Sequence, residues 1–365
     1  MRKKQIVLVV LFFAMLILPT VIFVAFKPFA DSENLEKRTL VTFEDVVNAP
    51  YIQIPATFTS FLNDNLPFKT QLTELNSLVS MSVFNTTANP KVMVGKDGWL
   101  FYNNIGLENP IDDVIGVTTF SGEEIEKIKY NIETAEKYLK EQDTELYILL
   151  APNKENICFS LLPDYIYEIM APISRAGLLA ESIAKTDLNF AYPKPELELA
   201  LSGQQLYYKY DSHWNACGAY VGTRVLFDMM GIELPPLESY DIESLPGGST
   251  DLADMAAITA NCKDDPKYTL NFESGVSYSG TEIAYGTNLY TSNASDKRTV
   301  LVIGDSYFHE MEPYLAKTFA TVIAVNRNAG PFDPYALIEE YKPDIIVIEV
   351  VERGCSILLH DDILL

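Results

Sequence analysis

The stretch Val300-Leu301-Val302-Ile303-Gly304-Asp305-Ser306-Tyr307 decides the fold. Its first half is a short apolar run that predicts a strand, and the Gly-Asp-Ser turn after it presents a hydroxyl where that strand ends. A second motif, Asp211-Ser212-His213-Trp214, lies upstream. A carboxylate, an imidazole and a hydroxyl are the groups that acyl-transfer chemistry uses. The two motifs therefore predict a nucleophile, its base and the group that orients the base.

His213 is the predicted base, because the chain has few histidines and only this one lies beside an orienting carboxylate after an expected strand. The chain contains three of them, which are His213, His309 and His360. In an extended segment side chains two residues apart point the same way, so Asp211 and His213 share a face while Trp214 packs against the other. The structural alternative is that Asp211 caps a helix opening near Asn215 and that the Gly-Asp-Ser stretch is an ordinary strand-to-helix turn.

Helical and extended segments alternate from Ser121 onward. Ser121 and Glu124 make a capping box, and apolar residues then recur at helical spacing through about Gln142. The alternation predicts an α/β fold with a parallel sheet covered by helices on both faces. Ligands bind outside the carboxyl ends of the strands in such sheets, where both motifs fall. The expected strands cover residues 146–150, 188–192, 206–210, 300–303, 321–325 and 345–350.

Residues 6–26 form an uncharged stretch of 21 residues, preceded by three basic residues and followed by Lys27. At 1.5 Å per residue it is long enough to cross a bilayer core of roughly 30 Å. A cleaved signal peptide is the alternative, but its apolar region is usually only about 7 to 15 residues long. We therefore expect a single-pass signal-anchor within residues 1–30, with the rest of the chain outside the cytoplasm by the positive-inside rule.

The remaining chain divides into a connector and a larger domain. Residues 31–95 read as a connector and an N-terminal helical region, with a helix candidate at 56–84. Residues 96–365 form the expected catalytic domain, which opens with a tight turn that enters an aromatic strand near Leu100. Within it, residues 233–297 are rich in Gly, Ser, Asp and Tyr and resist regular assignment. We expect this region to be a lid or an insertion over the sheet.

Charge and cysteine content limit the partners. The chain has 50 acidic and 27 basic side chains, a net charge of -23, so we expect no nucleic-acid partner. Four cysteines in a chain outside the cytosol allow one or two disulfides, with three full pairings. The sequence has no C-x-x-C pattern and no clustered Cys/His set, so we expect no metal site.

The order of the motifs resembles the DHHW family, which is related to the SGNH-hydrolase-like alginate O-acetyltransferases. Besides the Asp-x-His-Trp and Gly-Asp-Ser elements, the matching motifs are Glu33-Asn34, Asp64-Asn65-Leu66-Pro67-Phe68-Lys69, Gly95-Lys96-Asp97-Gly98-Trp99-Leu100-Phe101, Ala151-Pro152-Asn153-Lys154, Asp251-Leu252-Ala253, and Lys342-Pro343-Asp344 to Glu352-Arg353. The resemblance spans nearly the whole chain, and the combined order is specific although no single motif is. One departure is Ser212, where the family name expects a second histidine. We expect its side chain to face away from its neighbours.

The resemblance implies an SGNH-hydrolase-like fold and an O-acyltransferase activity, in the first place O-acetyltransferase, on a cell-envelope or exported polysaccharide. Ser306 would be the nucleophile, His213 the base and Asp211 its orienter, acting through an acyl-serine intermediate. No cofactor is expected, and the acyl donor would be a multispanning membrane acyltransferase. Two alternatives stay open, an extracytoplasmic carbohydrate esterase with the same triad and a non-catalytic polysaccharide-binding scaffold.

Other residues near the nucleophile are candidates for binding the oxyanion or the substrate. Ordinary SGNH enzymes use a Gly and an Asn from separate blocks, and we find no equivalents here. Arg327 follows the expected strand at 321–325, at the same end of the sheet as Ser306. It is suited to the developing charge or to an acidic sugar, unless it is a surface arginine. Tyr307 offers a backbone N–H beside the nucleophile. The aromatic rings that offer stacking faces for sugars, unless they belong to the core, are Tyr207, Tyr208, Tyr210, Trp214 and Tyr307.

Overall fold

The described residues form two compact units. The structure, a computed structural model, describes residues 7, 9–14, 17, 21, 39–65, 69–104, 108–271 and 275–365. The smaller unit contains α2 (Phe43–Asn48), α3 (Ile54–Asp64) and α4 (Lys69–Phe84), and the larger begins at Asn85. The helix expected at 56–84 is thus two helices.

The expected signal-anchor at residues 6–26 lies mostly outside the described residues. Only residues 7, 9–14, 17 and 21 of that stretch are described. Within the described part of the chain, no helix combines the length and the apolar composition needed to cross a membrane. The anchor therefore stays a prediction from the sequence.

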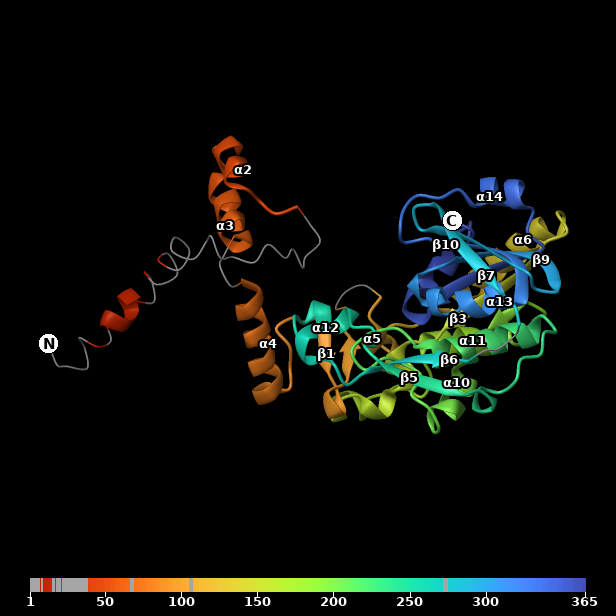
Figure 1. Ribbon diagram of the computed structural model, residues 1–365, viewed down its shortest axis with the longest axis horizontal. Coiled ribbons are helices and arrows are strands. Elements are labelled where there is room, and N and C mark those ends of the chain that lie inside the picture. The colour runs from red at the N-terminus through yellow and green to blue at the C-terminus, as the bar shows by residue number, and fades with distance from the viewer. Residues whose placement is uncertain are drawn as a thin grey trace. The chain divides into compact units, whose positions relative to one another are not determined.

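A seven-stranded sheet forms the centre of the larger unit (Figure 1). In spatial order its strands are β4 (Phe190–Ala191), β3 (Glu145–Ala151), β11 (Ile345–Val351), β9 (Asp296–Gly304), β10 (Phe319–Asn326), β8 (Thr287–Ser292) and β7 (Tyr278–Ala284). The first five strands are parallel, whereas β8 pairs antiparallel with both β10 and β7. The sheet is therefore mixed rather than wholly parallel. A two-residue turn, in which Gly286 has a φ of +74°, closes the β7–β8 hairpin, and a hairpin joins antiparallel strands.

Side chains of the parallel strands alternate between two cores, one on each face of the sheet. In β3, one core takes Tyr147, Leu149 and Ala151, and the other takes Leu146, Ile148 and Leu150. Helices α10 (Lys194–Leu201) and α11 (Ala216–Met229) cover the first face, and α6 (Gly122–Lys140), α9 (Arg175–Ile183) and α14 (Pro334–Tyr341) cover the second (Figure 1). Because both faces are covered, the buried parts of the central strands β3, β11 and β9 are mostly apolar. The predicted α/β class is confirmed.

Helix α6 begins at the predicted capping box. Ser121 Oγ accepts the backbone N–H of Glu124 at 3.2 Å, and the Glu124 carboxylate accepts the backbone N–H of Ser121 at 2.8 Å. These reciprocal bonds satisfy two backbone donors at the start of the helix. They place the first turn where the sequence pattern predicted it.

The stretch 206–210 is a loop, although a strand was expected there. In the described chain its ladder contact is an isolated bridge between Tyr207 and Trp214. The Asp265 carboxylate accepts two backbone N–H groups of the stretch, including that of Lys209 at 2.5 Å. Because these donors are satisfied by a side chain, the segment does not need a sheet partner. We call residues 206–214 the Asp211 loop.

The region 233–297 is more regular than expected. It contains a small antiparallel sheet of β5 (Ile242–Pro246) and β6 (Pro266–Leu270), the short helix α12 (Asp251–Met255), and the two antiparallel strands of the main sheet. The region is therefore partly an extension of the sheet itself.

The turn expected before the aromatic strand is present between β1 (Val92–Val94) and β2 (Leu100–Tyr102). The four cysteines, which were open to disulfide pairing, are all free thiols.

A glycine in α11 lies directly against the Asp211 loop and gives a test of this packing. A Cβ on Gly218 would overlap the carbonyl oxygen of Leu206 and lie 2.9 Å from Cβ of Trp214. We expect Gly218→Ala to lower the free energy of unfolding by about 1–3 kcal/mol, as overpacking does, in denaturant titrations. Gly122→Ala is the control, because a Cβ there meets nothing within 4 Å. Equal stabilities for the two variants would contradict the close approach of helix and loop.

Candidate active site

Ser306 lies where the central strand β9 ends. It opens the short 3-10 helix η6 (Ser306–Glu310), and Asp305 caps that helix. One oxygen of Asp305 accepts the backbone N–H of Tyr307 at 2.9 Å, and the other accepts the N–H of Val351, at the end of β11, at 2.7 Å. The turn that carries the hydroxyl is therefore fixed to the neighbouring strand.

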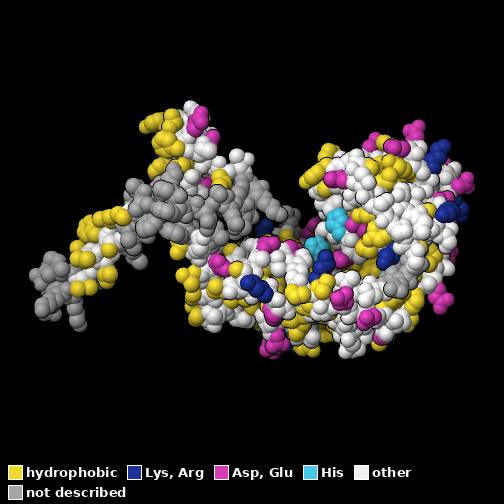
Figure 2. All heavy atoms as spheres, in the orientation of Figure 1, with side chains coloured by type: hydrophobic (Ala, Val, Ile, Leu, Met, Phe, Trp, Pro, Cys, Tyr) yellow, Lys and Arg dark blue, Asp and Glu magenta, His cyan; other side chains and the backbone are white. Residues whose placement is uncertain are grey.

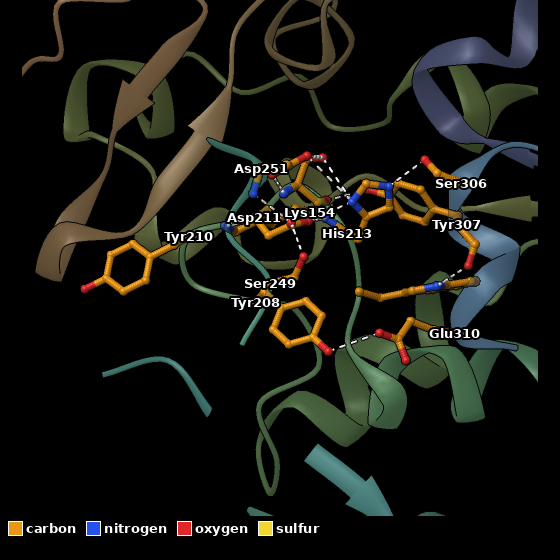
Figure 3. A network of polar contacts seen from close by, with 12 residues as sticks. Lys154, Tyr208, Tyr210, Asp211, His213, Ser249, Asp251, Ser306, Tyr307 and Glu310 are labelled. Atoms are coloured by element: carbon orange, nitrogen blue, oxygen red, sulfur yellow. Dashed lines mark hydrogen bonds and ion pairs between the residues drawn. The ribbon is translucent and has the colours of Figure 1, made fainter. Parts of the chain in front are cut away.

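Asp211, His213 and Ser306 form a continuous hydrogen-bonded chain (Figure 3). The distance from Ser306 Oγ to His213 Nε2 is 2.6 Å, and the distance from His213 Nδ1 to Asp211 Oδ1 is 2.7 Å. With its proton on Nδ1, the imidazole donates to the carboxylate and accepts the serine hydroxyl, an assignment that follows from the partners. A nucleophile, a base and an orienting acid within hydrogen-bond reach can perform nucleophilic acyl transfer.

The Asp211 carboxylate is almost fully buried, with 1% of the residue exposed. Its Oδ1 accepts the Nδ1–H and, at 2.8 Å, the backbone N–H of His213. Its Oδ2 accepts the Ser249 hydroxyl at 2.6 Å and the backbone N–H of Asp251 at 2.9 Å. Burial raises the pKa of Asp211, but the hydrogen bond and charge of His213 and these further donors hold the pKa well below its usual range. The carboxylate is therefore ionised at neutral pH.

The environment of His213 favours its protonated form. Burial lowers the pKa of His213, but the hydrogen bond and charge of Asp211 outweigh burial, so the pKa lies above its ordinary value. The imidazole ring rests against the Tyr307 ring, with centroids 4.8 Å apart. The imidazolium that forms when Ser306 loses its proton is stabilised by this setting.

Lys154 supports the Asp211 loop, and sequence reasoning did not select it as a site residue. It is fully buried, and its Nζ donates to the carbonyl oxygens of Leu100 at 2.5 Å, Lys209 at 3.0 Å and Asp211 at 2.9 Å. An ammonium group has three N–H donors, and here each has a carbonyl acceptor. Burial lowers the pKa of Lys154, while nearby acidic groups oppose that change. A lysine directly after the buried strand β3 was the available signal in the sequence.

Several predicted binding residues lie in the core beneath the site. Trp214 is fully buried, and its Nε1–H donates to the carbonyl of Tyr307 at 2.8 Å. Tyr307 is also fully buried, and its hydroxyl donates to the carbonyl of Ser212 at 2.6 Å. The Tyr307 N–H already donates to Asp305, so it is not free for an oxyanion. The other three proposed stacking residues are each at most 7% exposed, namely Tyr207, Tyr208 and Tyr210. These rings pack in the core and present no face to a sugar.

A cavity of about 350 Å³ opens beside the serine. Its lining includes Ser306, Arg327, Arg353 and His360. Arg327 lies at the predicted end of the sheet and donates to the carbonyl of Ile303 at 3.1 Å, while its Nε and Nη1 atoms have no hydrogen-bond partner among the described residues. Arg353, which sequence reasoning did not select, lies over the Tyr307 ring at 5.4 Å. Two arginines therefore line the same cavity as the serine.

One face of the larger unit shows how its acidic side chains are distributed. Acidic side chains are scattered over the visible face of the larger unit and do not gather in one patch (Figure 2).

One cluster among the described residues has ligand atoms close enough for a metal ion. It consists of Asp211, His213 and Asp251, with ligand atoms within 4.8 Å of one another. The 2.7 Å between Nδ1 and Oδ1 is a direct hydrogen bond. It is shorter than the ~3.3 Å that separates two ligands on a tetrahedral zinc ion with bonds of ~2.0 Å. The geometry is that of a hydrogen-bonded triad.

Comparisons with known proteins agree with this architecture. The family model described as SGNH hydrolase-like domain, acetyltransferase AlgX, matches residues 92–341. No curated protein sequence matches the chain. PatB1 of Bacillus cereus is 18% identical, with a TM-score of 0.54 over 74% of this chain and 98% of that chain. A DHHW family protein of Eubacterium siraeum is 15% identical, with a TM-score of 0.51 over 74% of this chain and 98% of that chain. These structures share the fold of the larger unit.

The support from Lys154 predicts a large effect on stability. Lys154→Met leaves the buried carbonyl groups of Leu100 and Asp211 without this donor and leaves that of Lys209 with the backbone N–H of Leu100 alone, so we expect a loss of about 3 kcal/mol in the free energy of unfolding. Lys297→Met is the control, because Lys297 also donates to a carbonyl, that of Ala294 at 2.7 Å, but is exposed. Denaturant titration of both variants tests the prediction. A loss below about 1 kcal/mol for Lys154→Met would show that the Asp211 loop does not depend on the ammonium group.

Proposed function

This chain belongs to the SGNH hydrolase-like acetyltransferase AlgX family, as the order of its motifs predicted, and from this premise we propose that Ser306, His213 and Asp211 are its catalytic triad. The protein is an O-acetyltransferase of that family. We further propose that it is a membrane-anchored extracytoplasmic enzyme whose acceptor is a cell-envelope or exported polysaccharide. The continuous hydrogen-bonded chain from Ser306 Oγ to the Asp211 carboxylate is the observation that supports the triad most directly.

In the first half-reaction, Ser306 Oγ attacks the carbonyl carbon of the acetyl donor. The Oγ proton passes to His213 Nε2, to which the hydroxyl already points at 2.6 Å. Collapse of the tetrahedral intermediate breaks the bond to the donor's leaving group, which takes the proton from Nε2. The product is acetyl-Ser306 with a neutral imidazole. Asp211 stays ionised and stabilises the imidazolium formed in between.

In the second half-reaction, a sugar hydroxyl of the acceptor replaces the donor. It gives its proton to His213 Nε2 and attacks the acetyl carbonyl of acetyl-Ser306. The acetyl–serine bond breaks, Ser306 Oγ recovers the proton, and the acetylated sugar leaves. Transfer requires the acceptor to be held close and oriented, where effective molarities reach about 10⁵ to 10⁸ M.

We assign the negative charge of the tetrahedral intermediate to the side of Ser306 that faces the cavity. Arg327 and Arg353 line that cavity together with the nucleophile. Cationic donors near a developing oxyanion stabilise the transition state strongly in a partly enclosed site. We propose Arg327, which lines the cavity and whose buried Nε and Nη1 have no hydrogen-bond partner among the described residues, as the donor to that charge or to an acidic group on the acceptor.

The proposed location determines the donor. Outside the cytoplasm, acetyl groups must be exported, so we propose a multispanning membrane acyltransferase as the donor partner. The uncharged stretch at residues 6–26 with its basic flank supports a single-pass anchor that holds the domain near such a partner.

Substitution of the triad is the first test of this function. We expect Ser306→Ala and His213→Ala each to lower turnover by roughly 10³-fold or more, with no further loss when they are combined, because the residues act as a unit. Asp211→Asn should also impair turnover, since it favours the wrong imidazole tautomer. His309→Ala is the control and should retain activity, because His309 contacts Asn326 and Glu312 outside the triad. Near-normal turnover for both alanine variants would favour a non-catalytic scaffold.

The choice between transfer and hydrolysis is the second test. We expect slow hydrolysis of a small activated acetyl ester, and faster acetyl loss when the correct oligosaccharide is present, because a bound hydroxyl outcompetes water. Mass spectrometry should show acetylated sugar as the product and acetyl-Ser306 as the intermediate. Release of free acetate alone, at equal rates with and without every envelope glycan tested, would identify a carbohydrate esterase instead.

A further inference from the structure

A second carboxylate lies beside the imidazole of His213. Asp251 Oδ2 is 3.6 Å from His213 Nδ1, on the same side of the ring as Asp211 (Figure 3). It lies on α12, in the region that sequence reasoning treated as a lid. The side chain is 37% exposed, so it reaches the site from the solvent side.

Ser212 holds this carboxylate in place. Its hydroxyl donates to Asp251 Oδ2 at 2.6 Å, and its backbone N–H donates to Asp251 Oδ1 at 2.7 Å. The same hydroxyl is 3.5 Å from His213 Nδ1. The expectation that Ser212 faces away from its neighbours is therefore wrong. Ser212 faces Asp251 because the Asp211 loop turns here and does not continue as a strand.

Asp251 both donates to the Asp211 loop and accepts from it. The backbone N–H of Asp251 donates to Asp211 Oδ2, while the side chain of Asp251 accepts from Ser212, the next residue in the loop. One residue thus supplies both a donor to the buried carboxylate and an acceptor to the loop that carries it. If Asp251 served only to hold the loop, its hydrogen bonds would be sufficient. Its carboxylate also lies beside His213 Nδ1, where a negative charge acts on the imidazole.

We propose that Asp251 is a second positioning carboxylate of the active site, which stabilises the imidazolium of His213 through its charge and fixes the Asp211 loop through Ser212. The inference rests on the proposed function of the triad. It gives the α12 region a part in catalysis, because this region supplies both the backbone donor and the carboxylate. The reaction steps are unchanged, since Asp251 exchanges no proton with the substrate.

The other charged groups near His213 do not provide the same effect. Asp211 is the direct partner of Nδ1, and Arg353 opposes protonation of the ring through its positive charge. Glu310 also interacts with the imidazole electrostatically, although its carboxylate accepts from the Tyr208 hydroxyl at 3.1 Å. Among the described residues, Asp211 and Asp251 are therefore the two carboxylates with an oxygen within 4 Å of a His213 ring nitrogen. Burial and the charge of Asp211 raise the pKa of Asp251 itself.

Direct titration of His213 separates this inference from the proposed function. The ring signals of His213 in the full-length protein can be followed by NMR against pH in Asp251→Asn, which keeps the shape and an acceptor for Ser212 but removes the charge. We expect the pKa of His213 to fall by about one unit, because a nearby negative charge favours the protonated ring. An unchanged pKa would overturn the electrostatic role, whether or not the protein transfers acetyl groups.

Asp265→Asn is the matched control. Asp265 belongs to the same region and accepts backbone N–H groups of the same loop, but it has no contact with His213 in the described structure. It should destabilise the loop without moving the His213 pKa. An equal shift in both variants would mean that loop distortion, and not charge, is the cause. In Asp251→Glu, which keeps the negative charge, the pKa of His213 should stay at its wild-type value. A fall like that in Asp251→Asn would contradict a role for the charge.

The rate should follow the titration. If the triad works as proposed, the pH profile of kcat/KM for a small activated acetyl ester also changes in Asp251→Asn. Its acid limb moves to lower pH by about one unit, because His213 stays in its neutral, basic form down to a lower pH. If Asp251→Asn fails to fold, Asp251→Ser is the second variant, since its hydroxyl can still accept the N–H of Ser212. A shifted NMR titration without any esterase or transferase rate would support the electrostatic effect of Asp251 on His213 and reject the proposed function.

Discussion

The buried charge of Asp211 is the constraint on which the rest of the site depends. A carboxylate with 1% exposure is costly unless donors surround it, and four donors do so. Two come from His213 and two from residues 249–251, while Lys154 holds the carbonyl of the same residue. Segments remote in the chain must therefore converge on one residue. That convergence, more than any local propensity, gives the Asp211 loop its conformation.

The parallel strands provide the platform for this convergence. In the sheet, Asn326 pairs with Gly304 and Val351 pairs with Ala151, so neighbouring strands end at nearly the same level. The chain leaves these ends carrying Ser306, Arg327, Arg353 and Lys154, each within a few residues of its strand. Because parallel strands point the same way, these side chains gather at one edge. The two triad motifs, 93 residues apart in the chain, meet there.

The sequence allowed accurate prediction where a local signal has one physical meaning. The capping box at Ser121 and the apolar runs of the strands are of this kind. The loop at 206–210 was misread because its aromatic residues suit a strand as well as a core, and only the remote Asp265 decides between them. Lys154 was overlooked for a related reason. A buried ammonium group is interpretable only once its three carbonyl acceptors are known, and these come from separate segments.

The turn that carries the nucleophile shows how the sheet and the chemistry restrict each other. Glu349, in the central strand β11, is fully buried and accepts the backbone N–H of Asp305 at 3.1 Å. A Cβ at Gly304 would lie 2.7 Å from Glu349 Oε2, so the glycine is required by the carboxyl group beneath it. Burial, together with the charge of Asp305, raises the pKa of Glu349 well above its ordinary value, which favours a neutral acid under the turn. A neutral group here adds no negative charge beneath Ser306, beside which we propose that the oxyanion forms. The glycine thus makes room for the buried acid, and the acid binds the backbone of the turn that carries Ser306.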